Sequence, residues 1–139
     1  MKSTEELMHE IENSRSFVDY LEGNAEEMQL HPFPECLDGW LKKKQHSRAD
    51  VVRQSNLNKA YVYQIFSGRK YPSRDKVIAL GFGLKLNIEE MPLLLKQAGY
   101  RTLYPRDTRD ALLLFALKEG MNILDTNNLL YDHEVEVLE

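Results

Sequence analysis

The sequence predicts an all-α protein with a helix-turn-helix motif near its centre. Three observations predict this class: apolar residues recur at helical spacing, Ser, Asn and Gly stand at the expected helix ends, and no alternating apolar run is bounded by hairpin turns. A chain of 139 residues suffices for one domain with appendages. We expect an acidic N-terminal helix and Pro-containing connector over 1–33, a helix-turn-helix domain over 34–103, and a C-terminal helical hairpin over 104–139.

The first expected helix begins at a capping box formed by Ser3 and Glu6. Its apolar face would hold Leu7, Ile11, Val18 and Leu21, and Gly23-Asn24 would end it. Two interpretations of this helix stay open: it packs on the domain, or it contacts a second copy of itself. The segment His31–Pro34 should be an extended connector, because each proline disfavours helical angles in the residue before it.

The central helices come next. Glu35–Gln45 should bury Leu37, Trp40 and Leu41 and turn Lys42–Lys44 outward. Ser47–Gln54 and Asn58–Ser67 then form two short helices joined by a tight turn, with apolar contacts from Val51, Leu57, Val62 and Ile65. Asn56 should take the left-handed conformation in that turn, Asn58 should cap the second helix, and Gly68 should end it.

The remaining helices form an internal repeat. Ser73 should cap a helix through Leu84, and Asn87 should cap a helix over 88–98 that Gly99 ends. A shift of 35 positions then aligns the following pairs: Arg74-Asp75 with Arg109-Asp110, Val77-Ile78 with Leu112-Leu113, Asn87-Ile88 with Asn122-Ile123, Leu94-Leu95 with Leu129-Leu130, and Leu103 with Leu138. The repeat predicts two stacked helical hairpins, the second packed on the first.

The charges are unevenly distributed. The net charge is −4, yet residues 40–76 hold ten Lys or Arg against two acids, while 1–39 hold two against ten and 77–139 hold six against ten. Binding of phosphate groups requires local positive potential rather than a positive total. The basic segment coincides with the two central helices, which favours a nucleic-acid surface over a merely solvated face.

Several other classes of protein receive no support from the sequence. No apolar run approaches the ~20 residues of a membrane span and no cleavable signal precedes the first helix. Cys36 is the single cysteine, so an intrachain disulfide is excluded and a cytoplasmic location is expected. His9, His31, His46 and His133 form no metal-ligand spacing with Cys36. We therefore expect no metal, no cofactor and no enzymatic activity.

The central motif resembles the lambda-repressor/Cro-like family, also called the XRE family. The resembling residues are Ser47-Arg48, Val51-Val52, Asn56-Leu57, Val62, Ile65-Phe66, Gly68-Arg69-Lys70 and Pro72-Ser73. The resemblance implies a five-helix domain over about 34–100 and a sequence-specific transcriptional regulator that binds double-stranded DNA as a homodimer. Val52 departs from the alanine that the family prefers, and Ser55 stands where an apolar residue is common. Tyr104-Pro105, Arg109-Asp110 and Leu129-Leu130 are similar to extended regulators of this family in Gram-positive bacteria, which are associated with Ser/Thr kinase genes.

The resemblance also implies residue roles. Lys59, Ala60, Tyr61, Tyr63 and Gln64 would form the exposed, base-reading side of helix 58–67. Gln64 suits adenine, Lys59 suits guanine O6 and N7, and Ala60 can meet a thymine methyl. Phosphate contacts would come from Ser47, Arg48, Asn58, Arg69 and Lys70.

An alternative remains open for the same helix. Tyr61 and Tyr63 could be half-buried aromatics, with Phe66 in the core. The protein could then be an interaction adaptor that uses the motif as a scaffold and grips a protein partner with its hairpins, in connection with a Ser/Thr kinase system.

Overall fold

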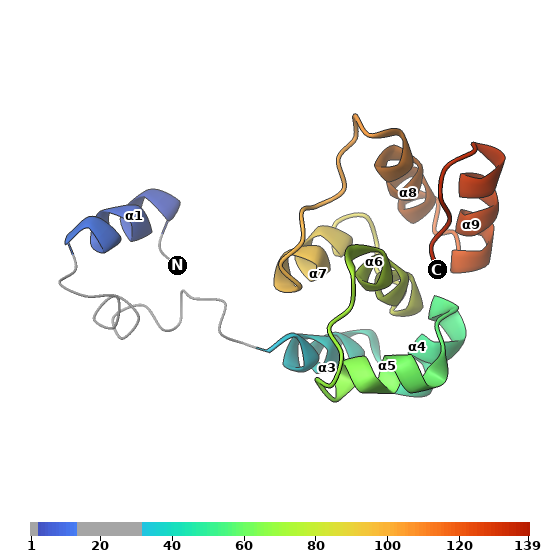
Figure 1. The fold of residues 1–139 in the computed structure, drawn as a ribbon, viewed down its shortest axis with the longest axis horizontal. Coiled ribbons are helices and arrows are strands. Elements are labelled where there is room, and N and C mark those ends of the chain that lie inside the picture. The colour runs from blue at the N-terminus through green and yellow to red at the C-terminus, as the bar shows by residue number, and fades with distance from the viewer. Residues whose placement is uncertain (1–2, 14–31) are drawn as a thin grey trace. The chain divides into compact units, whose positions relative to one another are not determined.

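The structure is a computed structural model that describes residues 3–13 and 32–139 (Figure 1). The chain divides into two units, Met1–Pro32 and Phe33–Glu139. In the first unit, α1 (Thr4–Asn13) begins as predicted, because the Glu6 amide donates to Ser3 Oγ over 3.1 Å. The later part of this expected helix, from Val18 to Gly23-Asn24, lies outside the described residues, as does His31.

In the second unit, α3 (Phe33–Lys44) begins two residues earlier than the sequence predicts. We expected Phe33 and Pro34 in an extended connector, but both belong to the first turn of α3. A proline is tolerated there because the amide that it lacks would have no intrahelical partner. Lys44 also differs from the expectation, since it is partly buried and its Nζ lies 2.6 Å from Glu90 Oε1.

The next two helices agree with the sequence. α4 spans Arg48–Ser55 and α5 spans Lys59–Phe66, with Asn56 in the left-handed conformation at φ 59°. Asn58 Oδ1 accepts a hydrogen bond from the Tyr61 amide over 3.2 Å and so caps α5. The predicted core residues of this pair, Val51, Leu57, Val62 and Ile65, are all buried, and so is Phe66.

The central helix of the second unit is α6 (Arg74–Gly83), capped by Ser73 as predicted. It contacts α4 on one side and α7 and α9 on others, and every residue from Val77 to Gly83 is buried. A Cβ at Gly83 would lie 2.9 Å from both Ser55 Cβ and the Val51 carbonyl oxygen. The small Ser55, 1% exposed, therefore permits the close approach of α4 to α6.

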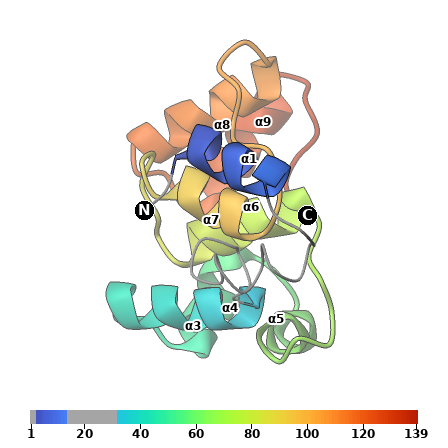
Figure 2. The same ribbon diagram turned by 90° about the vertical axis from the view of Figure 1, so that its left-hand side faces the viewer.

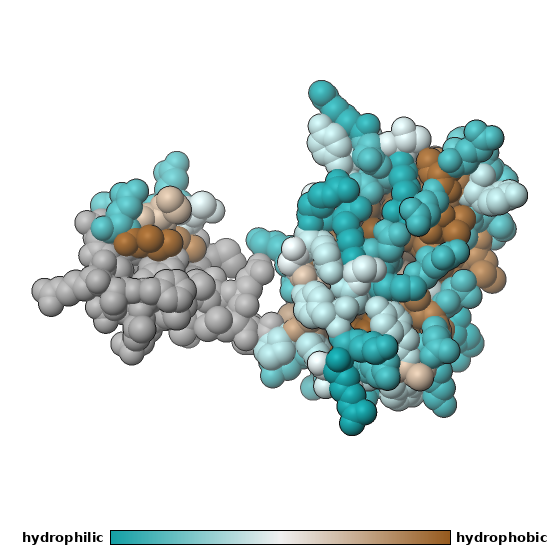
Figure 3. All heavy atoms as spheres, in the orientation of Figure 1, coloured by the Kyte–Doolittle hydropathy of each residue, from teal (hydrophilic) through white to brown (hydrophobic). Residues whose placement is uncertain are grey.

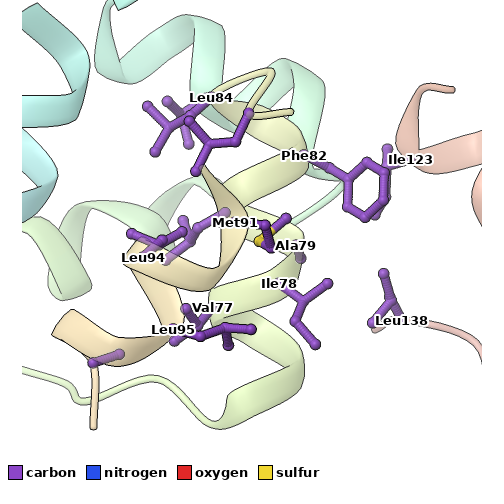
Figure 4. Close-up of a cluster of buried hydrophobic side chains, with 14 of the residues drawn as sticks. Val77, Ile78, Ala79, Phe82, Leu84, Met91, Leu94, Leu95, Ile123 and Leu138 are labelled. Carbon is purple, nitrogen blue, oxygen red and sulfur yellow. The ribbon is translucent and has the colours of Figure 1, made fainter. Parts of the chain in front are cut away.

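α7 spans Met91–Gln97 and begins three residues later than the expected start at Ile88. The physical reason is Pro92, which lacks an amide hydrogen and whose ring would clash with the carbonyl of Ile88 in a continuous helix. Asn87 still acts as a cap, because its side-chain oxygen accepts from the amides of Glu89 and Glu90. Figure 4 shows side chains of α6, α7, α9 and the C-terminal segment converging in one core.

The last two helices, α8 (Thr108–Lys118) and α9 (Ile123–Asp132), form the second hairpin of the repeat. The backbone repeats as the sequence does. Lys85 and Gly120 both have positive φ in the turn between the two helices of their hairpins. Gly99 and Glu134 both have positive φ directly after the second helix of their hairpins. In Figures 1 and 2, α8 and α9 lie at one end of this unit and α5 lies at the other.

Two crossed ion pairs join the hairpins. Arg74 donates to Asp110 over 3.2 and 2.9 Å, and Arg109 donates to Asp75 over 2.8 and 2.9 Å. Each arginine also donates to two backbone carbonyls in the segment that follows its own hairpin. Arg74 donates to the carbonyls of Arg101 and Thr102, and Arg109 donates to those of Glu136 and Val137. The two hairpins therefore pack with reciprocal, two-fold-like contacts.

The fold class is all-α: the described residues hold only helices and irregular segments, with no strand. None of the described helices combines the length and the hydrophobicity that a bilayer crossing requires. On the face shown in Figure 3, apolar residues of the second unit gather over α8 and α9, and hydrophilic residues cover most of the rest.

Candidate nucleic-acid interface

The outer side of α5 is the centre of the candidate interface. Lys59, Ala60 and Tyr63 are exposed, and Gln64 is partly buried. Lys59 Nζ lies 5.9 Å from the centre of the Tyr63 ring, close enough for a cation–π contact. These four residues thus share one accessible side of the helix, as the sequence predicted for a base-reading face.

Tyr61 differs from its four neighbours on the predicted face. It is partly buried and packs against the core, and this burial raises the pKa of its phenol, to which nearby Tyr100 also contributes. Lys70 Nζ and Lys76 Nζ lie 5.8 and 5.7 Å from the centre of its ring. Tyr61 therefore places a neutral aromatic ring between two ammonium groups at the edge of α5 and is not a freely exposed side chain.

The loop that follows α5 presents two further cations. Gly68 has φ 81°, and the amides of Arg69 and Lys70 both donate to the carbonyl of Gln64, at 2.9 and 3.2 Å. These bonds fold the loop back onto the end of α5, and the side chains of Arg69 and Lys70 are exposed. The left-handed φ is inexpensive for glycine, which has no Cβ.

The start of α4 is more constrained than the sequence suggested. Ser47 and Asp50 cap each other, with the Ser47 amide 2.8 Å from Asp50 Oδ2 and the Asp50 amide 3.1 Å from Ser47 Oγ. The backbone bond from Ser47, together with the Arg53 guanidinium, lowers the pKa of Asp50 to about 2. An ionised carboxylate thus already occupies this helix N-terminus, where we expected Ser47 to face phosphate.

Arg48, another expected phosphate contact, is held by two neighbours. Its guanidinium carbon lies 5.2 Å from the centre of the Phe66 ring, and one of its nitrogens lies 3.6 Å from Asp38 Oδ1. The side chain keeps 42% of its surface exposed. The Phe66 contact fixes the direction of Arg48 across α4 and α5, while Asp38 offsets part of its charge.

Lys76 is the cation that sequence reasoning missed. It stands in the first turn of α6 and joins Tyr61 and the turn residues Asn56–Asn58 in lining a shallow groove of about 500 Å³ at the start of α5, with Glu139 on the same groove. The sequence places Lys76 in the basic segment, but the approach of α6 to α5 depends on tertiary packing. No local signal distinguished Lys76 from other solvated lysines.

Other chemistry receives little support in the part of the chain that the structure describes. No three His, Cys, Asp or Glu side chains there cluster as metal ligands would. Burial, with a contribution from Glu35, raises the pKa of the Cys36 thiol, which therefore stays protonated at neutral pH. Comparison with family models, curated proteins and solved structures finds no match to this chain.

Proposed function

We propose that the protein is a sequence-specific DNA-binding transcriptional regulator that places α5 in the major groove. In this proposal α3–α7 form a lambda-repressor/Cro-like domain and α4–α5 are its helix-turn-helix motif. The observation that carries the proposal is the accessible side of α5, where Lys59, Ala60, Tyr63 and Gln64 lie together on a short, well-capped helix. A groove-reading helix needs such a side accessible to the base edges.

The surrounding charges support the same proposal. Arg69 and Lys70 follow α5, Arg48 crosses toward it from α4, and Lys76 borders its first turn. Cations around a reading helix position it through phosphate contacts, whereas side chains on the helix itself discriminate between bases. Positive charge of this kind gives an affinity that falls steeply with salt.

Fluorescence anisotropy with DNA selected from a random pool tests the proposal. Affinity should fall by roughly one power of salt concentration for each phosphate contact. The double variant Lys59→Ala/Gln64→Ala should bind selected and scrambled DNA with similar affinity, because the base contacts are lost. Arg69→Ala should weaken binding to both DNAs alike and reduce the salt slope by about 1.

Arg106→Ala provides the matched control. Arg106 is an exposed arginine two residues before α8, and α8 lies at the end of the unit away from α5 (Figure 1). This variant should bind selected DNA as the unaltered protein does. Full discrimination in the Lys59→Ala/Gln64→Ala variant would refute the assignment of base-reading residues, and undetectable DNA binding at low salt would refute the function itself.

A protein-interaction adaptor is the second candidate function. The observation that favours it is the apolar surface over α8 and α9 in Figure 3, which a simple DNA reader does not require. Phe115 of α8 and Leu124 of α9 are each exposed large apolar side chains. A pull-down at low salt from the source cells distinguishes the two candidates. A stoichiometric protein partner without enriched DNA would favour the adaptor.

A further inference from the structure

The internal repeat allows the surfaces of the two hairpins to be compared position by position. On α6, Gly83 lies against Ser55 and Val51 of α4, and Leu80, three residues before it, is 0% exposed. The equivalent positions on α8, 35 residues later, are Phe115 and Lys118, and Phe115 is 46% exposed. The side of α8 that corresponds to the covered side of α6 is therefore open.

We define the open α8 face by five residues: Asp107, Ala111, Leu114, Phe115 and Lys118. The last four stand at spacings of three, one and three residues, which places them on one side of α8. Asp107 is the N-cap directly before the helix, and its Oδ1 accepts from the Asp110 amide over 2.9 Å. Ala111 and Leu114 are partly buried, and Asp107, Phe115 and Lys118 are exposed. An acid stands at the N-terminal end of this face, a base at the C-terminal end, and apolar groups lie between them.

Such a stripe is complementary to itself when two helices run antiparallel. Lys118 of one helix then lies beside Asp107 of the other at both ends, and the apolar centres meet. Ala111 lets the two backbones approach closely. We propose that the open α8 face binds a second copy of this chain, through two-fold antiparallel pairing of the two α8 helices.

The charge distribution disfavours two other surfaces, those of α1 and α5, as the contact between two copies. α1 has four glutamates and neither lysine nor arginine, so two copies of α1 would repel each other. The surroundings of α5 are basic and would also repel their own copy. Because α8 and α5 lie at opposite ends of the unit (Figures 1 and 2), pairing through α8 leaves both α5 helices uncovered.

Sedimentation equilibrium of the full chain without DNA tests this proposal independently of DNA binding. A single helix crossing buries less surface than a standard interface, so we expect a reversible dimer. It should dissociate as the protein concentration is lowered from about 300 µM to about 1 µM. Phe115→Glu should weaken the dimer by about 100-fold, because it places two carboxylates in the apolar centre. Leu124→Glu is the matched control: Leu124 is 59% exposed on α9, outside the open α8 face, and this variant should dimerise normally.

Lys118 provides a second test that leaves the core untouched. Lys118→Glu should weaken the dimer by about tenfold, because it faces Asp107 of the other copy, whereas Lys118→Arg should retain it. Thermal unfolding followed by circular dichroism confirms that each variant folds. The proposal is overturned by a full chain that stays monomeric over the whole concentration range, or by Phe115→Glu dimerising as well as the unaltered chain.

Discussion

The crossed ion pairs between the hairpins predict an unequal response to two equivalent substitutions. Asp110 and Asp75 occupy the same position in the two repeats, and each accepts a bidentate pair of hydrogen bonds from the arginine of the other repeat. Their surroundings differ. The Asp110 side chain is 2% exposed and also accepts from the Tyr104 amide over 3.0 Å, whereas the Asp75 side chain is 32% exposed.

Asp110→Ala should therefore cost much more stability than Asp75→Ala. Removing one partner of a buried ion pair costs about 3 to 5 kcal/mol, because the remaining charge stays desolvated. Arg74 keeps its hydrogen bonds to the carbonyls of Arg101 and Thr102, so we expect a cost near the lower limit, about 3 kcal/mol. Water can replace the partly exposed carboxylate of Asp75, so we expect about 1 kcal/mol there.

Urea unfolding followed by circular dichroism measures both free energies of unfolding. The difference of about 2 kcal/mol corresponds to roughly 30-fold in the ratio of folded to unfolded protein, well above the error of such measurements. Asp110→Asn should fall between the two alanine variants, because an amide oxygen can still accept from the Tyr104 amide. Equal costs for Asp110→Ala and Asp75→Ala would refute the reasoning, since burial would then have no influence on these pairs.

Two further predictions concern packing and acid stability. Gly83→Ala should destabilise the protein by about 2 kcal/mol because its Cβ would overlap α4, whereas Gly39→Ala, with no atom within 4 Å of the added Cβ, should stabilise it by about 0.5 kcal/mol. Urea unfolding of both variants measures these changes. An unchanged free energy of unfolding in Gly83→Ala would contradict the close approach of α4 to α6. The pKa of Asp50, lowered to about 2 in the folded state, implies that its contribution to stability is fully present above about pH 4 and disappears as the pH falls toward 2. The stability difference between the unaltered protein and Asp50→Asn should therefore shrink over that range, and a difference independent of pH would show that ionisation of Asp50 is not responsible.

The sequence predicted correctly which residues of α5 are exposed at most of the candidate interface, but it predicted other parts of the interface wrongly. Lys59, Ala60 and Tyr63 are exposed as predicted, because helix periodicity alone determines which side of α5 opposes Val62 and Ile65. Tyr61 stands at the border of that side, where it packs against the core, and Lys70 and Lys76 approach its ring from other segments. Periodicity within one helix holds no information about such neighbours.

The sequence by itself determined the local features of this protein. Caps at Asn58 and Ser73 and the left-handed turn at Asn56 depend on side chains within about four positions, so they were readable without any tertiary contact. The 35-residue repeat likewise predicted two equivalent hairpins. The exceptions, the starts of α3 and α7, are both places where a proline lies within the first helical turn.

The tertiary structure decided how these pieces oppose one another. It paired each repeat arginine with the aspartate of the other repeat, set Gly83 against Ser55, and covered α6 with α4 while leaving the equivalent side of α8 open. These outcomes join residues about 30 positions apart in the chain, where the contacts depend on the packing of whole helices and not on local propensity. Equivalent positions in the two repeats therefore have different neighbours, which is why α8 has an open face where α6 is covered.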